Sequence, residues 1–228
     1  MGNLFSVPLI FEYAPAILSR FHITLLIVAA SVFGGTLLGF LLAGARLRKI
    51  PVLNVLCVVY ISFIRGTPII IQMFIIYYGF PLLLNLIDIN INRMDKLYFV
   101  LISYALNNAA FMAEIIRSAV TSVPPGQLDA ARSIGLSDFQ SFRRVILPQA
   151  FLIAFPSFGT RVVNAFESTS LAFTLGILDM IGQAEAIGAR TYHLLEGYTV
   201  VAVAFVAVSL LLERFFILVG RRLVREGA

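Results

Sequence analysis

The chain has 228 residues, of which 60% are hydrophobic and only 13% are charged, whereas soluble domains are about half apolar and about one quarter charged. A water-soluble fold is therefore excluded, in line with a mean hydropathy of +0.94. The 17 Lys and Arg residues exceed the 12 Asp and Glu residues. They do not cluster in a soluble domain, so nucleic acid is not an expected partner.

Neither a disulfide nor a metal centre is expected. Cys57 is the single cysteine and lies inside an apolar run, which excludes an internal disulfide or a metal site built from cysteines. His22 and His193 are far apart in the sequence and have no companions at ligand spacing. Residues 1–19 have no Lys or Arg ahead of their apolar stretch and no small-residue cleavage pattern, so we expect no cleaved signal peptide.

Five apolar runs are long enough to cross a bilayer, which takes about 20 residues of helix. They lie at residues 21–45, 51–86, 97–119, 152–175 and 198–219. The sequence thus predicts an all-α polytopic membrane protein whose five transmembrane helices form a single domain over residues 1–228. An Arg-Gly-Thr-Pro sequence at residues 65–68 interrupts the second run. We expect one broken helix there, and a bend at Pro156 in the fourth run, because proline removes a backbone hydrogen bond.

Small and polar side chains inside these runs predict close packing of helices. Four small residues recur at four-residue spacing along the first run and let another helix approach closely: Ser31, Gly35, Gly39 and Ala43. In the third run, Ser103, Asn107 and Asn108 are expected to form hydrogen bonds between helices. Glu114 and Arg117, three residues apart near the end of that run, are expected to pair along one helix face.

The basic residues predict the orientation, because Lys and Arg accumulate in the short loops on the cytoplasmic side of a membrane. With the N-terminus outside, four basic residues face outward, namely Arg20, Arg93, Lys96 and Arg190. Eleven then face inward, namely Arg46, Arg48, Lys49, Arg117, Arg132, Arg143, Arg144, Arg214, Arg221, Arg222 and Arg225. This asymmetry predicts an external N-terminus and a cytoplasmic C-terminus, and it accounts for the net charge of +5.

Residues 118–148, between the third and fourth runs, form a polar segment with distinct structural signals. Two prolines and Gly126 end the preceding helix, and residues 127–133 favour a short helix. Gly135 then suits the left-handed position after a helix end. Ser137 and Gln140 have the spacing of a capping box for a second helix. We therefore expect a helix, a glycine corner and another helix on the cytoplasmic face.

This segment resembles the transmembrane subunits of binding-protein-dependent ATP-binding cassette (ABC) importers, in particular their polar amino-acid branch. The family signature is Glu-Ala-Ala, a Gly four residues later, and then Ile-x-Leu-Pro. The chain has Asp-Ala-Ala at residues 129–131, Gly135, and Val-Ile-Leu-Pro at residues 145–148, so Asp129 replaces the usual Glu. Similar motifs occur in the same order at residues 63–68, 113–117 and 168–171, so the resemblance covers residues 24–219.

The resemblance implies a type I importer permease in the cytoplasmic (inner) membrane, with a coupling helix that docks into a groove of an ATPase subunit. The implied coupling residues are Gly126, Asp129, Ala130, Ala131, Arg132 and Gly135. The implied partners are two ABC ATPase subunits, a second permease subunit, identical or paralogous, and an extracytoplasmic substrate-binding protein. The chain contains no G-x-x-x-x-G-K-[ST] motif. We therefore expect no catalytic residue, cofactor or metal in it, with ATP and Mg bound by the partner ATPase.

Ionisable side chains at membrane depth are costly and should face a pathway or a partner. In the fourth run, Thr160, Glu167 and Thr174 recur every seven residues and share a helical stripe. The Glu167 carboxylate either meets the amino group of an amino-acid substrate or forms a structural ion pair with Arg65, and the sequence leaves both alternatives open. The expected substrate-pathway residues are Glu167, Asn164, Thr160, Ser168, Arg65 and Arg161.

The function that these features predict is import of a polar amino acid, with an ion-gradient-driven secondary transporter as the alternative. Secondary transporters usually carry internal repeats, and we find none. An intramembrane enzyme would need more nucleophiles and bases at membrane depth than the chain offers. Residues 168–173 and 192–198 are similar to cystine-type permeases, while histidine, glutamine or a basic amino acid remain open, as does the choice of homodimer or heterodimer. Asp179 and Glu185 are interpreted as a solvated face on a segment that also suits contact with the binding protein.

The predicted orientation can be tested by labelling single cysteines from outside the cell in a Cys57→Ala background. A membrane-impermeant thiol reagent should react with Asn90→Cys, between the second and third runs, and should not react with Ser137→Cys unless the membrane is opened. The reverse labelling pattern would overturn the topology.

Overall fold

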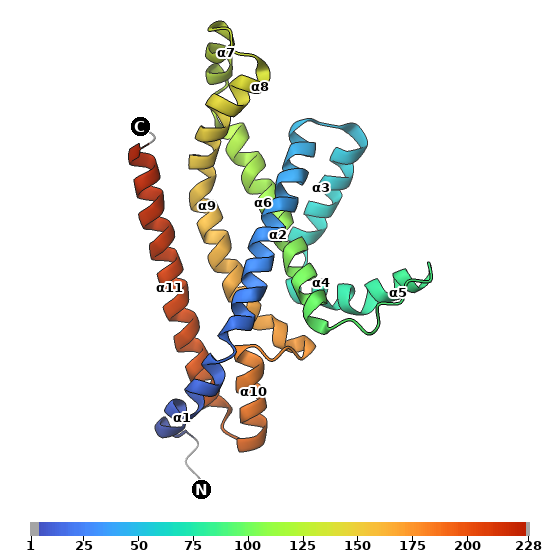
Figure 1. The fold of residues 1–228 in the computed structure, drawn as a ribbon, viewed down its shortest axis with the longest axis vertical. Helices are drawn as coiled ribbons and strands as arrows, with labels where there is room; N and C mark the ends of the chain where they lie inside the picture. Colours follow the sequence, from blue (N-terminus) through green and yellow to red (C-terminus); the bar gives the residue numbers. More distant parts are fainter. Residues whose placement is uncertain (1–4, 227–228) are drawn as a thin grey trace.

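Residues 5–226 are described by a computed structural model, in which they form an elongated bundle of helices (Figure 1). Four long helices run along the bundle: α2 (Phe21–Leu47), α6 (Lys96–Ser122), α9 (Leu147–Ser168) and α11 (Leu194–Glu226). Each belongs to a helix that is long and apolar enough to span a membrane. No strand occurs in the described part of the chain, and the predicted all-α class is confirmed.

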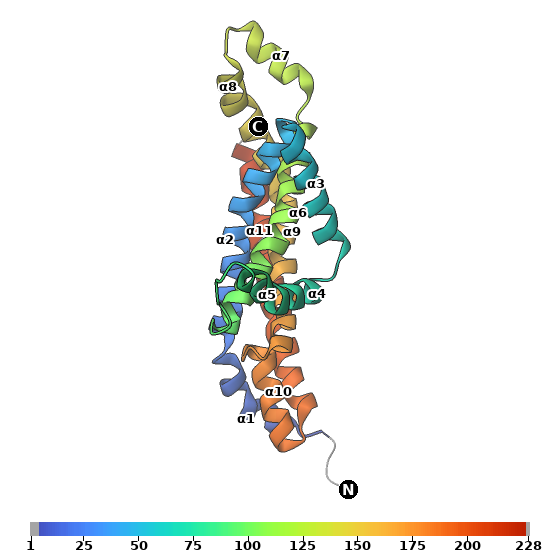
Figure 2. The same ribbon diagram turned by 90° about the vertical axis from the view of Figure 1, so that its right-hand side faces the viewer.

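Shorter helices gather at the two ends of the bundle (Figures 1 and 2). At one end lie α1 (Val7–Leu18) and α10 (Met180–Thr191), whereas α7 (Pro125–Ser133) and α8 (Asp138–Ser141) project from the other. The last turns of α11 lie toward the same end as α7 and α8 (Figure 1). This arrangement is the one that the predicted orientation requires, and the direction in which the bundle crosses the membrane stays a prediction.

The contact between α2 and α6 is the most extensive between any two helices of the described chain. It is made by the predicted stripe of small residues on α2, all of which are buried. A Cβ atom on Gly35 would lie 2.6 Å from Cβ of Asn108, and one on Gly39 would lie 2.6 Å from Cβ of Met112. These separations are far below van der Waals contact, so only glycine permits the observed approach of the two helices.

The second apolar run breaks where the sequence predicts, but more sharply than a kink. Its first half is α3 (Pro51–Gly66), and its second half comprises α4 (Ile69–Phe74), the π-helical turn η1 (Ile75–Gly79) and α5 (Phe80–Asn85). The two halves are bent by 115°, and α4 and α5 run across the bundle rather than along it (Figure 1). Thr67 and Pro68 are extended between them, because proline disfavours helical geometry in the residue before it.

The fourth apolar run is joined to the second loop helix, although the two were predicted as separate helices. α8 continues through the π-helical turn η2 (Phe142–Ile146) into α9 and then into the 3₁₀ helix η3 (Thr169–Leu175), so that one helix of 38 residues runs from Asp138 to Leu175. Pro148 is the second residue after η2, as Pro81 is after η1. A proline cannot donate the usual backbone hydrogen bond, and a wide turn ahead of it accommodates the loss without ending the helix. The helix also continues through Pro156.

The helix α1 was not predicted, because residues 1–19 were considered only as a leader. Its side chains Tyr13 and Ile17 are buried against α10 and α11. The backbone N–H of Ser6, just ahead of α1, donates a hydrogen bond of 2.8 Å to the buried carboxylate of Glu196 on α11. The N-terminal segment is therefore an integral part of this end of the bundle.

The prediction of a solvated face at Asp179 is wrong. Its side chain is fully buried and accepts a hydrogen bond of 2.8 Å from the N–H of Gly182, which caps the start of α10. Burial raises the pKa of Asp179 to about 6. Glu185 is half-buried and accepts a hydrogen bond from the hydroxyl of Tyr198. Both carboxylates therefore serve the packing of α10 more than contact with solvent.

The glycine contact between α2 and α6 leads to a prediction about stability. Gly39→Val should destabilise the protein by about 1–3 kcal/mol, as overpacking of a tight contact does, and should lower the midpoint of thermal unfolding in detergent. Gly44→Val on the same helix is the matched control, because a Cβ there meets nothing within 4 Å. Equal midpoints for the two variants would contradict the proposed role of the stripe.

Candidate functional site

A chain of hydrogen bonds centred on Arg161 connects four helices in the middle of the bundle. The guanidinium of Arg161 donates to Oδ1 of Asn108 at 2.7 Å and to Oδ1 of Asn107 at 2.6 Å. Nδ2 of Asn108 then donates to the carbonyl oxygen of Ser31 at 3.0 Å, and Nδ2 of Asn107 donates to Oε1 of Gln72 at 2.9 Å. The interhelical role predicted for the two asparagines is present in the structure. The same prediction is wrong for Ser103, whose hydroxyl donates to the carbonyl oxygen of Phe99 within α6. The guanidinium of Arg161 thus lies between α9 and α6 and away from the stripe of Glu167.

The hydrogen bonds of Arg161 extend, through Gln72, to the break between α3 and α4. Nε2 of Gln72 donates to the carbonyl oxygens of Ile64 and Thr67 at 2.8 and 3.0 Å. These carbonyl groups lie at the end of α3, where the helix leaves its last acceptors without partners. The buried Gln72 side chain therefore stabilises the sharp bend between α3 and α4.

The predicted stripe forms an exposed face of α9. Thr160, Asn164 and Glu167 are all exposed on it, and the Glu167 carboxylate accepts a long hydrogen bond of 3.3 Å from the hydroxyl of Ser209 on α11. Ser168 is half-buried and donates its hydroxyl proton to the carbonyl oxygen of Asn164 at 2.7 Å. A carboxylate, an amide and a hydroxyl on one open face can bind a polar cation such as an ammonium group.

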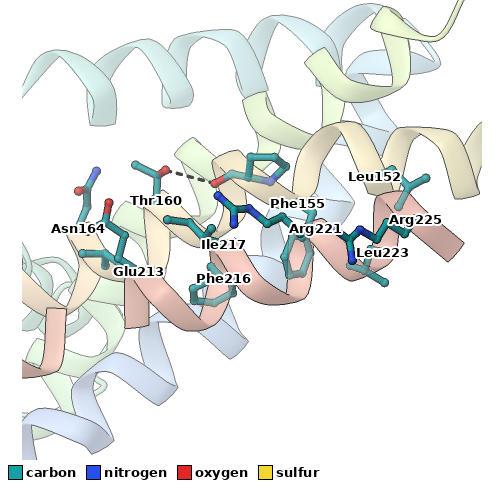
Figure 3. A pocket seen from close by; sticks show the side chains of 14 residues that line it. Leu152, Phe155, Thr160, Asn164, Glu213, Phe216, Ile217, Arg221, Leu223 and Arg225 are labelled. Carbon is teal, nitrogen blue, oxygen red and sulfur yellow. Dashed lines mark hydrogen bonds between the residues drawn. The ribbon is translucent and has the colours of Figure 1, made fainter. Parts of the chain in front are cut away.

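A groove of about 620 Å³ lies between α9 and α11, within the size range of small-molecule sites. Thr160 and Asn164 line it from α9, and Glu213 and Arg221 line it from α11 (Figure 3). The helices meet closely at Gly159, where a Cβ atom would lie 2.7 Å from Cβ of Phe216. The sequence analysis did not consider Glu213, although an acidic residue inside the fifth apolar run is the signal that could have identified it.

Arg65 lies apart from the stripe. Within residues 5–226, no salt bridge joins Arg65 to Glu167, so the structure does not support the ion-pair alternative for Glu167. The guanidinium of Arg65 instead lies 5.8 Å from the ring centre of Phe111, whose ring also lies 3.9 Å from the guanidinium of Arg161. The predicted pathway residues therefore divide into an exposed stripe on α9, the network of Arg161, and the surroundings of Arg65.

The predicted pair of Glu114 and Arg117 is confirmed, with Nη2 of Arg117 lying 2.8 Å from Oε2 of Glu114. The other carboxylate oxygen of Glu114 accepts from Arg46 at the end of α2. Both oxygens of this carboxylate are thus occupied by guanidinium groups from two helices.

The loop between α6 and α9 has the predicted local structure. Gly135 adopts a left-handed backbone with φ of +85°, and the side chains and backbones of Ser137 and Gln140 form the reciprocal capping box. Arg132 donates to Asp138 at 2.9 Å across the glycine corner. The loop projects beyond the bundle (Figure 2).

The projecting loop also exposes apolar side chains. Ile134 is 79% exposed and Phe139 is 72% exposed. On α7, Ala131 is buried, whereas Gly126, Asp129 and Ala130 are exposed. A large exposed apolar side chain in a polar loop marks a surface that suits a protein partner.

Comparisons with known proteins identify relatives of this chain. Residues 35–225 match the family described as binding-protein-dependent transport system inner membrane component. The L-cystine transport system permease protein TcyL of Bacillus subtilis (strain 168) is 44% identical over 226 residues, which cover 99% of this chain and 95% of that protein.

Two solved structures share the fold. The crystal structure of an amino acid ABC transporter with histidines matches with a TM-score of 0.86 and 29% identity over 95% of this chain and 98% of its own. An inward-facing conformation of the MetNI methionine ABC transporter matches with a TM-score of 0.73 and 19% identity, covering 96% of this chain and 99% of that chain.

Proposed function

This chain belongs to the family of binding-protein-dependent transport system inner membrane components, and on that premise we propose that it is the membrane-spanning subunit of an ATP-driven importer for a polar amino acid. That it is an amino-acid ABC transporter permease follows from the family and its relatives. The observation that carries the proposal is the loop of residues 118–148, which extends an ordered helix pair and exposed apolar side chains away from the bundle. Such a surface suits an ATPase subunit, and the coupling residues predicted from the sequence belong to this loop, where Ala131 is buried and the others are exposed.

The continuous helix from Asp138 to Leu175 supplies the means of coupling. It begins at the capping box beside the glycine corner and carries Thr160, Asn164 and Glu167 farther along. A displacement of the loop by a partner is therefore passed to the exposed stripe through one rigid element. In this mechanism ATP binding closes the two ATPase subunits, the loops move with them, and the membrane helices open outward.

The complete transporter contains two ATPase subunits, a second permease subunit, and an extracytoplasmic protein that delivers the substrate. ATP and Mg are bound by the ATPase subunits. The N-terminal end with α1 and α10 faces outward, toward the binding protein, and the loop of residues 118–148 faces the cytoplasm. An ion-gradient-driven transporter has no evident use for this loop, so that alternative is not favoured.

The substrate is an amino acid whose ammonium group meets the Glu167 carboxylate. The similarity to the cystine permease of B. subtilis makes L-cystine the first substrate to test. The exposed carboxylate of Glu167 and the neighbouring Asn164 and Thr160 offer a negative charge, an amide and a hydroxyl on one face. Arg161 holds this helix against α6 and has a positioning role.

Coupling can be tested at Gly135, whose positive φ is strained for any residue with a branched side chain. Gly135→Val should leave the protein inserted and assembled but abolish uptake, and loaded binding protein should no longer stimulate ATP hydrolysis. Gly44→Val, on α2 and outside the loop, is the control, since a Cβ at Gly44 meets nothing within 4 Å. Stimulated hydrolysis and uptake at the wild-type rate in the Gly135 variant would refute the coupling role.

Substrate contact can be tested by Glu167→Gln, which retains shape and removes the charge. A charge-assisted hydrogen bond is roughly twice as strong as a neutral one, so we expect about a tenfold loss of uptake at low substrate concentration, with assembly and basal ATP hydrolysis preserved. Glu12→Gln, an exposed carboxylate on α1, is the control.

The same experiment separates the two interpretations of Glu167. If the carboxylate only neutralised Arg65, the double variant Arg65→Gln with Glu167→Gln would recover uptake and stability. We expect no such recovery, because the two side chains are not paired in the structure. Full uptake by the single Gln variant would remove Glu167 from the substrate site.

A further inference from the structure

A second cavity, of about 310 Å³, opens between α3, α6 and α9. Its charged lining residues are Arg65 from α3 and Glu114 and Arg117 from α6, and its hydroxyl groups come from Ser118 and Ser157. A volume near the lower end of the range for ligand pockets suits a small polar group. Glu114 and Arg117 lie in the last third of α6, so the cavity lies on the side of the bundle that leads to the loop.

The cavity is surrounded by an excess of positive charge. Arg46 and Arg117 both pair with the carboxylate of Glu114, and Arg65 lines the same cavity as Glu114 and Arg117. Three guanidinium groups and one carboxylate give this cluster a formal charge of +2. Glu114 pairs with Arg46 and Arg117, and no salt bridge joins it to Arg65 within residues 5–226.

Two donors of the cluster have no partner among residues 5–226. Nε of Arg46 is buried and makes no hydrogen bond there. Arg65 contacts the face of Phe111 but forms no salt bridge within the described chain. An ionised side chain at membrane depth should face a partner or a polar pathway. Arg65 is exposed and lines the cavity, so its guanidinium can receive an anion there.

The cavity lies beside the proposed substrate stripe on α9, with Ser157 in line with Asn164 and about 80° around the helix from Glu167. Ser157 precedes Asn164 by seven residues, or two turns of α9, so the two side chains lie on the same face. At 1.5 Å per residue, Ser157 is about 15 Å closer to the loop than Glu167. An amino acid that leaves Glu167 toward the cytoplasm therefore moves along this face toward the three arginines.

We propose that this cavity is an anion-binding station on the cytoplasmic half of the pathway, which holds the carboxylate of the imported amino acid after its ammonium group has left Glu167. The forked donors of Arg65 match the two oxygens of a carboxylate. Arg117, whose Nε and Nη2 already donate to Glu114, adds positive charge and its remaining N–H groups. Glu114 orients Arg117 and Arg46, and its own charge weakens the site enough for release. The inference rests on the proposed function, whose stripe supplies the outer contact.

The test measures binding of radiolabelled L-cystine and of radiolabelled inorganic phosphate to the assembled transporter, in nanodiscs of phosphatidylcholine. The transporter carries Glu167→Gln, so that the outer contact does not contribute. Adding Arg65→Gln should weaken L-cystine binding about tenfold, the effect of losing one hydrogen bond to a charged group. Adding Glu114→Gln should strengthen it several-fold, because a competing carboxylate is removed. Arg143→Gln, an exposed arginine in η2, should change nothing.

Competitors distinguish the chemical group that is bound. L-Cystine dimethyl ester keeps both ammonium groups and lacks free carboxylates, so it should not displace L-cystine. Displacement by the ester, or binding that is indifferent to Arg65→Gln, would overturn the assignment. Phosphate or an added anionic lipid that binds with the same dependence on Arg65, while L-cystine does not bind, would also overturn it in favour of a phosphate group.

Two further measurements separate a failure of the cavity assignment from a failure of assembly or of the proposed substrate. If Glu114→Gln fails to assemble, Arg65→Gln alone decides the outcome, since its side chain is exposed. ATP-dependent uptake of L-cystine by the wild-type transporter is measured in the same preparation. Absence of uptake would count against the proposed substrate, whereas normal uptake without any effect of Arg65→Gln would count against the cavity alone.

Discussion

The hydrogen bonds of Arg161 are the constraint on which the placement of the other helices depends. A guanidinium at membrane depth is tolerated only where its donors are satisfied, and here it takes the amide oxygens of Asn107 and Asn108. The Oδ1 atom of each asparagine accepts from Arg161, and the Nδ2 atom of each donates to another helix. Each finds an acceptor on a different helix, Gln72 on α4 and the carbonyl of Ser31 on α2.

The direction of these bonds links the substrate helix to the bend between α3 and α4. Arg161 donates a hydrogen bond to Asn107, and Asn107 donates one to Gln72. Gln72 in turn donates to the carbonyl groups at the end of α3. Removing any member leaves a buried group unpaired, which costs about 1–3 kcal/mol for a neutral group and more for a charged one. The glycines of α2 act on the same contact, because their lack of side chains lets α2 reach Asn108.

Features that depend on local spacing could be predicted from the sequence. The small-residue stripe, the pair of Glu114 and Arg117, the capping box at Ser137 and the left-handed Gly135 all follow from neighbours within a few residues, and all are present in the structure. The family signature in the loop rests on the same kind of information. This signature indicates the class of protein without any three-dimensional contact.

Features that depend on distant partners were missed or misjudged. Asp179 looks solvated in a polar stretch, but its role is decided by the α10 backbone and by burial beneath neighbouring helices. The sequence left open whether Glu167 pairs with Arg65, and the choice depends on the 115° bend and the network of Arg161, which give the two side chains different surroundings. The second loop helix and the fourth apolar run were predicted as separate helices, whereas the chain stays helical between them through the wide turn ahead of Pro148.

That wide turn has a consequence for the phase of the helix. A π-helical turn holds one more residue than an α-helical turn, so η2 acts as a one-residue insertion between α8 and α9. Each residue of an α-helix advances the side chain by about 100°. A chain without the extra residue would present Thr160, Asn164 and Glu167 about 100° away from their present direction relative to the loop. The loop and the stripe are thus held in register by the proline that makes the wide turn favourable.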